Sequence, residues 1–177
     1  PQMCKYGIVP LSQKEIVAAF TEPDKGTVVG YSLYNSLKLT TQVAKTIEVL
    51  SSEVEQQTKT IGGVLLKSCD LHYTPEVKNM IHMLDVLQNF EDIQDLNYRQ
   101  FISFCKDFAN GYNEKAFGYV LTKQRYQKKT ISFLRNILDY YGVENSLNKH
   151  LSVLSEYRHP TMEEIYEAAY FLKDTEI

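Results

Sequence analysis

The chain has 177 residues, of which 44% are hydrophobic and 23% are charged, and its formal net charge is −3. These apolar side chains are sufficient for a packed core, which argues against wholesale disorder. The slight excess of acidic residues also differs from the basic balance typical of nucleic-acid-binding domains.

The same sequence argues against secretion and against a membrane anchor. No apolar run reaches the roughly 18 residues that a membrane-spanning helix needs, and the first residues, PQMCKYGIVP, lack the apolar core of a secretory signal. Cys4, Cys69 and Cys105 are odd in number and lack paired spacing, which favours reduced thiols over a disulfide framework. We therefore expect an intracellular protein.

The first predicted element is a short helix. Ser12 and Glu15 have the spacing of a capping box, and the turn formers of residues 21–26 end the helix. Residues 7–11 and 27–29 could be extended, but no candidate strand competes seriously with the predicted helices.

A long helix is predicted next. Between residues 31 and 61, apolar side chains recur at alternating steps of three and four, which is typical of a helix in a bundle. Gly62 and Gly63 then predict a kink before the apolar run continues.

Caps mark the helices of the second half. Thr74 and Pro75 predict the start of a helix that continues to Leu87, and Asn110 with Gly111 predicts the end of the following one.

The last helices are predicted in the same way. Asn113 is the expected cap of a helix that carries apolar side chains through residues 117–141 and ends at Gly142. Residues 147–154 fit one more helix, and residues 161–164 have the pattern of a capping box for the final one.

These signals predict an all-α protein of about seven to nine helices with bundle-like packing. The acidic stretch at residues 91–95 suggests two consecutive lobes, an N-terminal helical lobe at 1–90 and a C-terminal helical lobe at 91–177 that carries a basic helix.

The basic helix is predicted from the segment KQRYQKKTISFLR, residues 123–135, which contains five cations and no acid. On a helical wheel its outer face holds four cations, while one lysine lies in the apolar sector and a tyrosine lies at the border. The predicted RNA-binding residues are accordingly Lys123, Arg125, Tyr126, Lys128, Lys129 and Arg135.

Two explanations fit this segment. The cations can simply form the solvated face of an amphipathic helix. Alternatively they bind a polyanion, which would offset the few tenths of a kcal/mol that like charges at i and i+4 cost. In that case the arginines would hold phosphates and Tyr126 would stack on a base, positioning a strand without reading its sequence.

Candidate catalytic and metal-binding residues are few. Cys69 with His72 resembles half a metal site, and Glu156 with His159 forms one Glu-x-x-His unit, but neither pattern has the second half it needs. His82 shares a helix face with Asp85, which is typical of a satisfied pair. We therefore predict no enzyme, no metal, no cofactor and no small-molecule substrate; a deep cleft converging on His82 or His159 would instead favour an enzyme.

The chain resembles the 21-kDa RNA-silencing suppressor family of closteroviruses. The resemblance rests on the chain length, the two helical lobes, the reduced thiols and the basic helix KAFGYVLTKQRYQKKTISFLR. The resemblance implies an all-helical homo-oligomer, assembled as a ring, that binds single- and double-stranded RNA without sequence specificity. It also implies sequestration of small RNA duplexes from silencing in the host cell cytoplasm, without a membrane. The alternative is a helical protein–protein interaction adaptor whose basic face meets an acidic partner.

Overall fold

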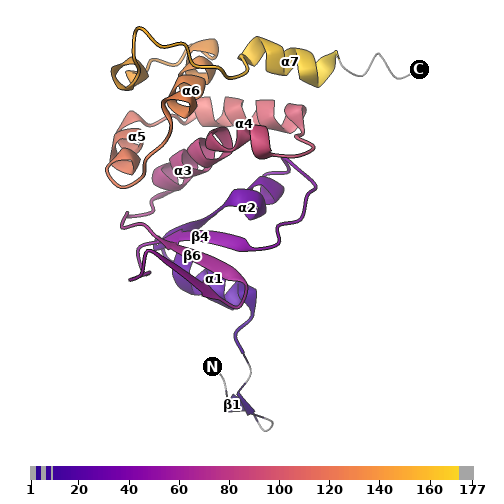
Figure 1. Ribbon diagram of the computed structural model, residues 1–177, viewed down its shortest axis with the longest axis vertical. Coiled ribbons are helices and arrows are strands. Elements are labelled where there is room, and N and C mark those ends of the chain that lie inside the picture. Colours follow the sequence, from indigo (N-terminus) through magenta and orange to yellow (C-terminus); the bar gives the residue numbers. More distant parts are fainter. Residues whose placement is uncertain (1–2, 5–6, 9, 172–177) are drawn as a thin grey trace, which may run out of the picture.

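The computed structural model describes residues 3–4, 7–8 and 10–171. Within this part of the chain the protein is mixed α/β, with a four-stranded sheet, a short hairpin, seven α-helices and two 3₁₀ helices. The all-α prediction is therefore wrong. The elements are stacked along the long axis of the molecule, with the sheet and α1 toward the N-terminus and α6 and α7 at the opposite end (Figure 1).

The sheet has the strand order β3-β4-β6-β5. Its strands are β3 (Gly26–Val29), β4 (Ile47–Ser51), β5 (Thr58–Ile61) and β6 (Val64–Ser68). β4 and β6 are parallel, and the other two pairings are antiparallel. β1 (Met3–Cys4) and β2 (Gly7–Ile8) form a separate antiparallel hairpin.

The sheet replaces most of the long helix predicted at residues 31–61. Helix α2 (Gly30–Ser36) covers only its beginning, and β4 and β5 follow. Gly62 and Gly63 are a hairpin turn between β5 and β6, not a helix kink, because their φ angles of +53° and +80° are both positive. Such angles suit a two-residue hairpin loop and favour glycine at both positions.

Of the two segments with a possible extended conformation, residues 27–29 lie in β3. In the segment 7–11, Gly7–Ile8 forms β2, residue 9 lies outside the described residues, and residues 10–11 have no strand. Residues 27–29, for which an extended conformation is only the alternative to the predicted all-helical chain, thus form a strand.

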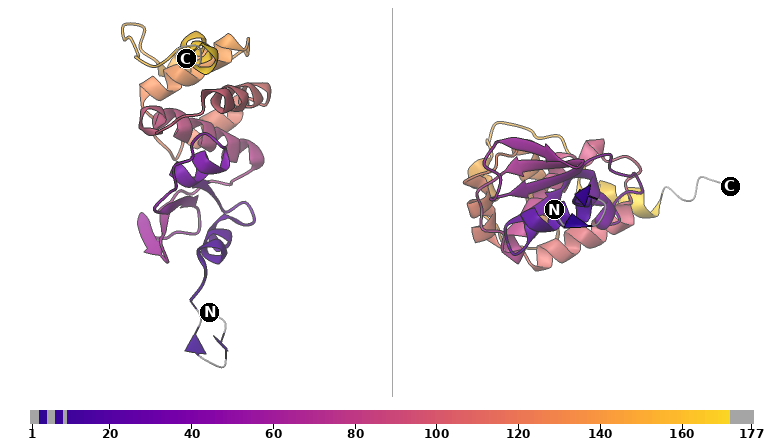
Figure 2. Two further views of the ribbon diagram at one scale, coloured as in Figure 1. Left: turned by 90° about the vertical axis from the view of Figure 1, so that its right-hand side faces the viewer. Right: turned by 90° about the horizontal axis from the view of Figure 1, so that it is seen from below.

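Helices cover both faces of the sheet. Helix α1 (Gln13–Thr21) lies across one face, as the view from below in Figure 2 shows, while α2 and α3 (Pro75–Gln88) lie on the other. Neighbouring residues of β4 point to different sides: Val49 belongs to a small core beneath α1, and Leu50 belongs to the main core. This alternation is expected of a strand that is buried on both faces.

The remaining helices form the C-terminal part of the molecule. They are η1 (Phe90–Asp92), α4 (Tyr98–Asn110), α5 (Glu114–Leu121), α6 (Lys128–Tyr140), η2 (Leu147–His150) and α7 (Met162–Tyr170). The main core extends from Val29 to Ala169 without a break near residue 90. At that position Phe90 contacts Phe101 and Phe133, with ring centroids 5.1 and 5.2 Å apart.

Several predicted helix ends are confirmed. The capping boxes of Ser12 with Glu15 and of Thr161 with Glu164 are both present. Thr74 and Asn113 accept backbone N–H groups at the starts of α3 and α5, and Gly142 follows α6 with φ +69°. The predicted helix at 147–154 is wrong, however, because only the short η2 forms and Val153 and Leu154 are fully exposed.

Candidate functional site

The predicted basic helix is not continuous. α5 ends at Leu121 and α6 begins at Lys128, so Arg125 and Tyr126 lie in the loop between them. The start of α6 is held by a distant residue: the side-chain oxygen of Gln88 on α3 accepts the N–H of Gln127 at 3.1 Å and also the hydroxyl of Thr130. This cap from another helix fixes where α6 begins.

Carboxylates lie within ion-pair distance of three of the five predicted RNA-binding cations. Lys123 Nζ lies 3.6 Å from Asp70 Oδ2, and Lys129 Nζ lies 2.6 Å from Glu91 Oε1. A third pair joins Arg135 Nε to Asp139 Oδ2 at 3.6 Å.

The other three predicted residues differ from one another. Arg125 and Lys128 are exposed and have no carboxylate within 4.0 Å in the described ranges. Tyr126, in contrast, packs against the main core, and desolvation raises the pKa of its hydroxyl. Its ring is therefore partly covered by the protein, and base stacking by this residue stays a prediction.

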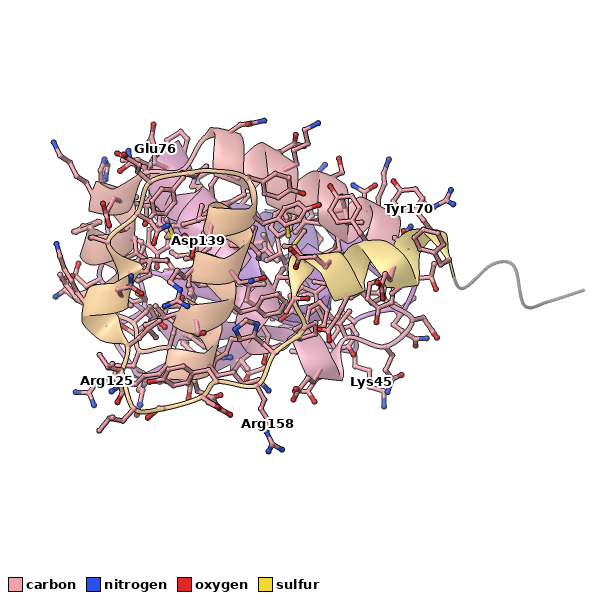
Figure 3. All side chains as sticks on the ribbon, turned by 90° about the horizontal axis from the view of Figure 1, so that it is seen from above. Lys45, Glu76, Arg125, Asp139, Arg158 and Tyr170 are labelled. Atoms are coloured by element: carbon pink, nitrogen blue, oxygen red, sulfur yellow. The ribbon has the colours of Figure 1, made fainter. Side chains whose placement is uncertain are left out.

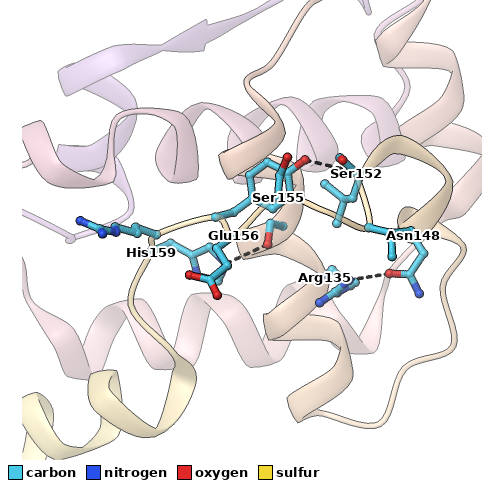
Figure 4. A pocket seen from close by; sticks show the side chains of 11 residues that line it. Arg135, Asn148, Ser152, Ser155, Glu156 and His159 are labelled. Atoms are coloured by element: carbon cyan, nitrogen blue, oxygen red, sulfur yellow. Dashed lines mark hydrogen bonds between the residues drawn. The ribbon is translucent and has the colours of Figure 1, made fainter.

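A cavity of about 660 Å³, open to solvent, lies beside α6. It is bounded by α6, by η2 and by the segment 151–159, and Figure 4 shows Arg135 and His159 on different sides of it. The polar lining comes from Ser132, Arg135, Asn148, Ser152, Ser155, Glu156, Tyr157, Arg158 and His159. The lining carries two guanidinium groups and one carboxylate, and the carboxylate of Asp139 lies just outside it, within ion-pair distance of Arg135.

Arg135 has an unsatisfied donor at this cavity. Its Nη1 donates to Asn148 Oδ1 at 2.5 Å, but its Nε is buried and has no hydrogen-bond acceptor among the described residues. The carboxylate of Asp139, at 3.6 Å, is within ion-pair distance but beyond a hydrogen bond. A buried guanidinium donor without an acceptor is costly, so an external anion would be stabilising there.

Ser132 and His159 form a hydrogen-bonded pair in the cavity wall. Ser132 Oγ lies 3.0 Å from His159 Nε2, and His159 Nδ1 lies 3.0 Å from the carbonyl oxygen of Pro160. A carbonyl oxygen only accepts, so Nδ1 carries the ring proton, and Nε2 of the neutral ring accepts the Ser132 hydroxyl. The imidazole is also stacked on Phe133, with centroids 4.9 Å apart.

The sequence singled out three members of this cavity for unrelated reasons, Arg135 as a phosphate ligand and Glu156 with His159 as a Glu-x-x-His unit. It missed Ser132, Asn148 and Arg158. No local pattern marks these residues, because the chain brings them together only when residues 151–160 fold back over α6. Figure 3 shows Arg158 pointing outward from the same edge of the molecule as Arg125.

His82 and Asp85 form no dyad. His82 Nε2 lies 2.6 Å from Thr27 Oγ1 of β3, whereas Asp85 accepts the N–H of Gly30 at the start of α2, at 2.9 Å. Desolvation lowers the pKa of His82 to about 4 and raises that of Asp85. Each group has a hydrogen-bond partner, but the predicted surface pair is wrong, because the two residues bond to other groups and lie in the α3–sheet interface.

The other candidate motif does not assemble a metal site. Cys69 is a buried free thiol, whereas His72 is exposed. Across the described residues, no group of three or more histidine, cysteine, aspartate or glutamate side chains is placed to hold a metal ion. In the same ranges, none of the helices combines the length and the hydropathy of a membrane span.

Comparison of the chain with protein-family models, with curated proteins and with solved structures gives no match.

Proposed function

We propose that this protein binds RNA through its phosphate backbone at the cavity beside α6, with Arg135 and Arg158 as the central ligands. The observation that supports the proposal is the buried Nε of Arg135, which lacks a hydrogen-bond acceptor at a cavity that a second arginine also lines. A guanidinium group matches the geometry of phosphate oxygens.

Two cations extend this site along the surface. Lys128, Ser132 and Arg135 occupy positions i, i+4 and i+7 of α6 and thus share one face. Arg125 lies in the loop just before that helix. A strand that follows this face would meet several cations in succession, which favours an extended polyanion over a single phosphate group.

Binding of this kind would be weak and independent of sequence. The proposed contacts reach phosphates and not base edges, so they position a strand without reading it. Assembly of several copies on one RNA would raise the avidity, which is why we propose a homo-oligomer as the active form. Sequestration of small RNAs in a host cell is the role that the closterovirus resemblance implies, although the mixed α/β fold departs from the all-helical architecture of that implication.

Fluorescence anisotropy with a labelled single strand and a labelled duplex tests the proposal at about 50 and 200 mM salt. Four phosphate contacts predict that the logarithm of affinity falls with the logarithm of salt with a slope of roughly −3. Arg135→Gln and Arg158→Gln should each weaken binding, whereas Lys59→Gln on the exposed strand β5 makes the same charge change elsewhere and should not.

Wild-type protein that binds no RNA at the lower salt concentration would refute the proposal. Equal losses in the cavity variants and in Lys59→Gln would also refute it, because the effect would then be one of net charge. Binding of polyglutamate in place of RNA would favour the adaptor function.

A second candidate, ester hydrolysis, is favoured by the Ser132–His159–Pro160 arrangement. The Ser132 hydroxyl would give its proton to His159 Nε2 while Oγ bonds to the carbonyl carbon of an ester, and the departing alcohol would take that proton. Water would then cleave the acyl–serine bond and release the acid. Release of p-nitrophenol from p-nitrophenyl acetate, abolished in Ser132→Ala, is the expected result; no release by wild-type protein removes this candidate.

A further inference from the structure

A row of stacked tyrosines lies on α6 and α7, away from the cavity residues. The ring of Tyr166 lies between those of Tyr140 and Tyr170, with centroids 5.5 and 6.2 Å away. The two outer rings are 42% and 49% exposed. We call these three residues the tyrosine row; Figure 3 shows Tyr170 at the end of α7.

Acidic side chains accompany the tyrosine row. Glu163, Tyr166, Glu167 and Tyr170 occupy positions i, i+3, i+4 and i+7 of α7, so they share one helix face. Both glutamates are exposed, and neither has a described cation within 4.0 Å. The pKa of Tyr140 is raised, first by desolvation and then by the neighbouring Tyr166 and Glu163.

One end of the row already binds a cation of the chain itself. Arg99 Cζ lies 4.9 Å from the ring centroid of Tyr170, and Arg99 Nε donates to the carbonyl oxygen of Ala169 at 3.2 Å. This is a cation–π contact, and the backbone hydrogen bond helps to fix it. No cation of the described residues occupies the equivalent position at Tyr140.

We propose that the tyrosine row, with Glu163 and Glu167, binds an arginine-rich segment of a partner protein. A partner guanidinium would stack on Tyr140 as Arg99 stacks on Tyr170, and the two carboxylates would pair with the flanking cations. RNA does not suit this face, because its phosphates would meet two unpaired carboxylates. The inference is independent of the RNA-binding proposal, which concerns other residues and the opposite charge.

A short fluorescein-labelled oligoarginine peptide, titrated with the full chain, tests this inference. Wild-type protein should bind the peptide, and Glu163→Gln/Glu167→Gln should weaken binding about fivefold through the loss of two exposed ion pairs. Tyr140→Leu, which retains an apolar side chain but removes the ring, should also weaken it.

The control is Glu55→Gln/Glu76→Gln. Both residues are exposed, the change in net charge is the same, and Glu76 lies in the first turn of α3 as Glu163 does in α7. The inference is overturned if wild-type protein does not bind the peptide, or if the control weakens binding as much as the α7 variant. It is also overturned if light scattering shows that the α7 variant dissociates a wild-type oligomer, since a second copy would then occupy the face.

Discussion

The α3–sheet interface and the cavity beside α6 both contain polar atoms that are buried from water, but these atoms differ in whether they have a hydrogen-bond partner. In the interface, His82 has Thr27 as its partner and Asp85 has the N–H of Gly30. At the cavity, the buried Nε of Arg135 has no acceptor.

The difference separates groups that stabilise the fold from groups that are available to a ligand. A buried polar group that is fully paired gains nothing from a further partner, whereas an unpaired one would gain the whole value of a charge-assisted hydrogen bond. Substitutions in the interface should therefore change stability, and substitutions at the cavity should change binding. Five predictions test this comparison.

The largest effect is expected at the sheet. A Cβ atom on Gly26 would lie 2.3 Å from the carbonyl oxygen of Leu50 and 2.4 Å from that of Phe20, and neither backbone can move freely. Gly26→Ala should therefore cost roughly 3 kcal/mol of unfolding free energy. Gly118→Ala on α5, where a Cβ meets nothing within 4 Å, should instead add about 1 kcal/mol; chemical denaturation of both variants compares them.

The next effect is a loss of stability in acid. The pKa of His82 falls from 6.5 to about 4 on folding, so its contribution is complete above pH 6.5 and is lost as the pH falls to about 4. The loss should amount to about 3 kcal/mol. Denaturation as a function of pH should show a smaller loss of stability in His82→Gln than in wild-type protein. Replacement of the exposed His72 by Gln should leave the full loss in place. An unchanged pH profile in His82→Gln would contradict the assignment of this loss to His82.

Asp85 should have a smaller effect with the opposite pH dependence. Asp85→Ala removes the acceptor for the N–H of Gly30, which should cost about 1 to 2 kcal/mol. Asp85→Asn retains an oxygen acceptor and should cost less. Because the folded pKa of Asp85 is raised, ionisation lowers stability as the pH rises above the usual value of 3.8. Urea titrations on both sides of that value should show wild-type protein losing stability relative to Asp85→Asn as the pH rises, because the contribution of His82 is common to both proteins.

At the cavity, Arg158→Gln should change the unfolding free energy by less than about 0.5 kcal/mol, because the side chain is exposed. The same variant should lower RNA affinity. Thermal unfolding and anisotropy on one preparation separate the two effects; a destabilised variant would mean that Arg158 supports the fold instead.

The smallest effect is expected at Lys129, whose side chain is 38% exposed and whose partner Glu91 is 70% exposed. Lys129→Gln should cost at most about 0.5 kcal/mol. RNA affinity should fall less than in Arg158→Gln, since the lysine charge is already paired. A larger loss of affinity would show that the pair opens to bind RNA.

Sequence reasoning succeeded where the determinants were local. The caps at Ser12, Thr74, Asn113 and Thr161 each involve residues within one turn, so their spacing predicts them directly. The sheet was missed because β4 and β5 are short strands in a region whose apolar spacing also fits a helix. The Gly62–Gly63 pair was the available hairpin signal.

The candidate site was less predictable, because its contacts are between distant residues. Ser132 and His159 are separated by 27 positions, and Gln127 is capped by Gln88 from 39 positions away. Helical periodicity cannot show such contacts. It placed Lys128 and Arg135 on one face of that helix, but it extended the helix through a loop and left out the carboxylate that pairs with Lys129.

The most direct test of phosphate binding at the cavity is the nitrogen–proton NMR signal of Arg135 Nε during titration with a short RNA strand. Arg135→Gln assigns the signal by its disappearance. The account predicts that this signal shifts downfield as RNA is added, because a phosphate oxygen replaces the missing acceptor. An Arg135 signal that stays unchanged while RNA binds, or an absence of RNA binding, would contradict it.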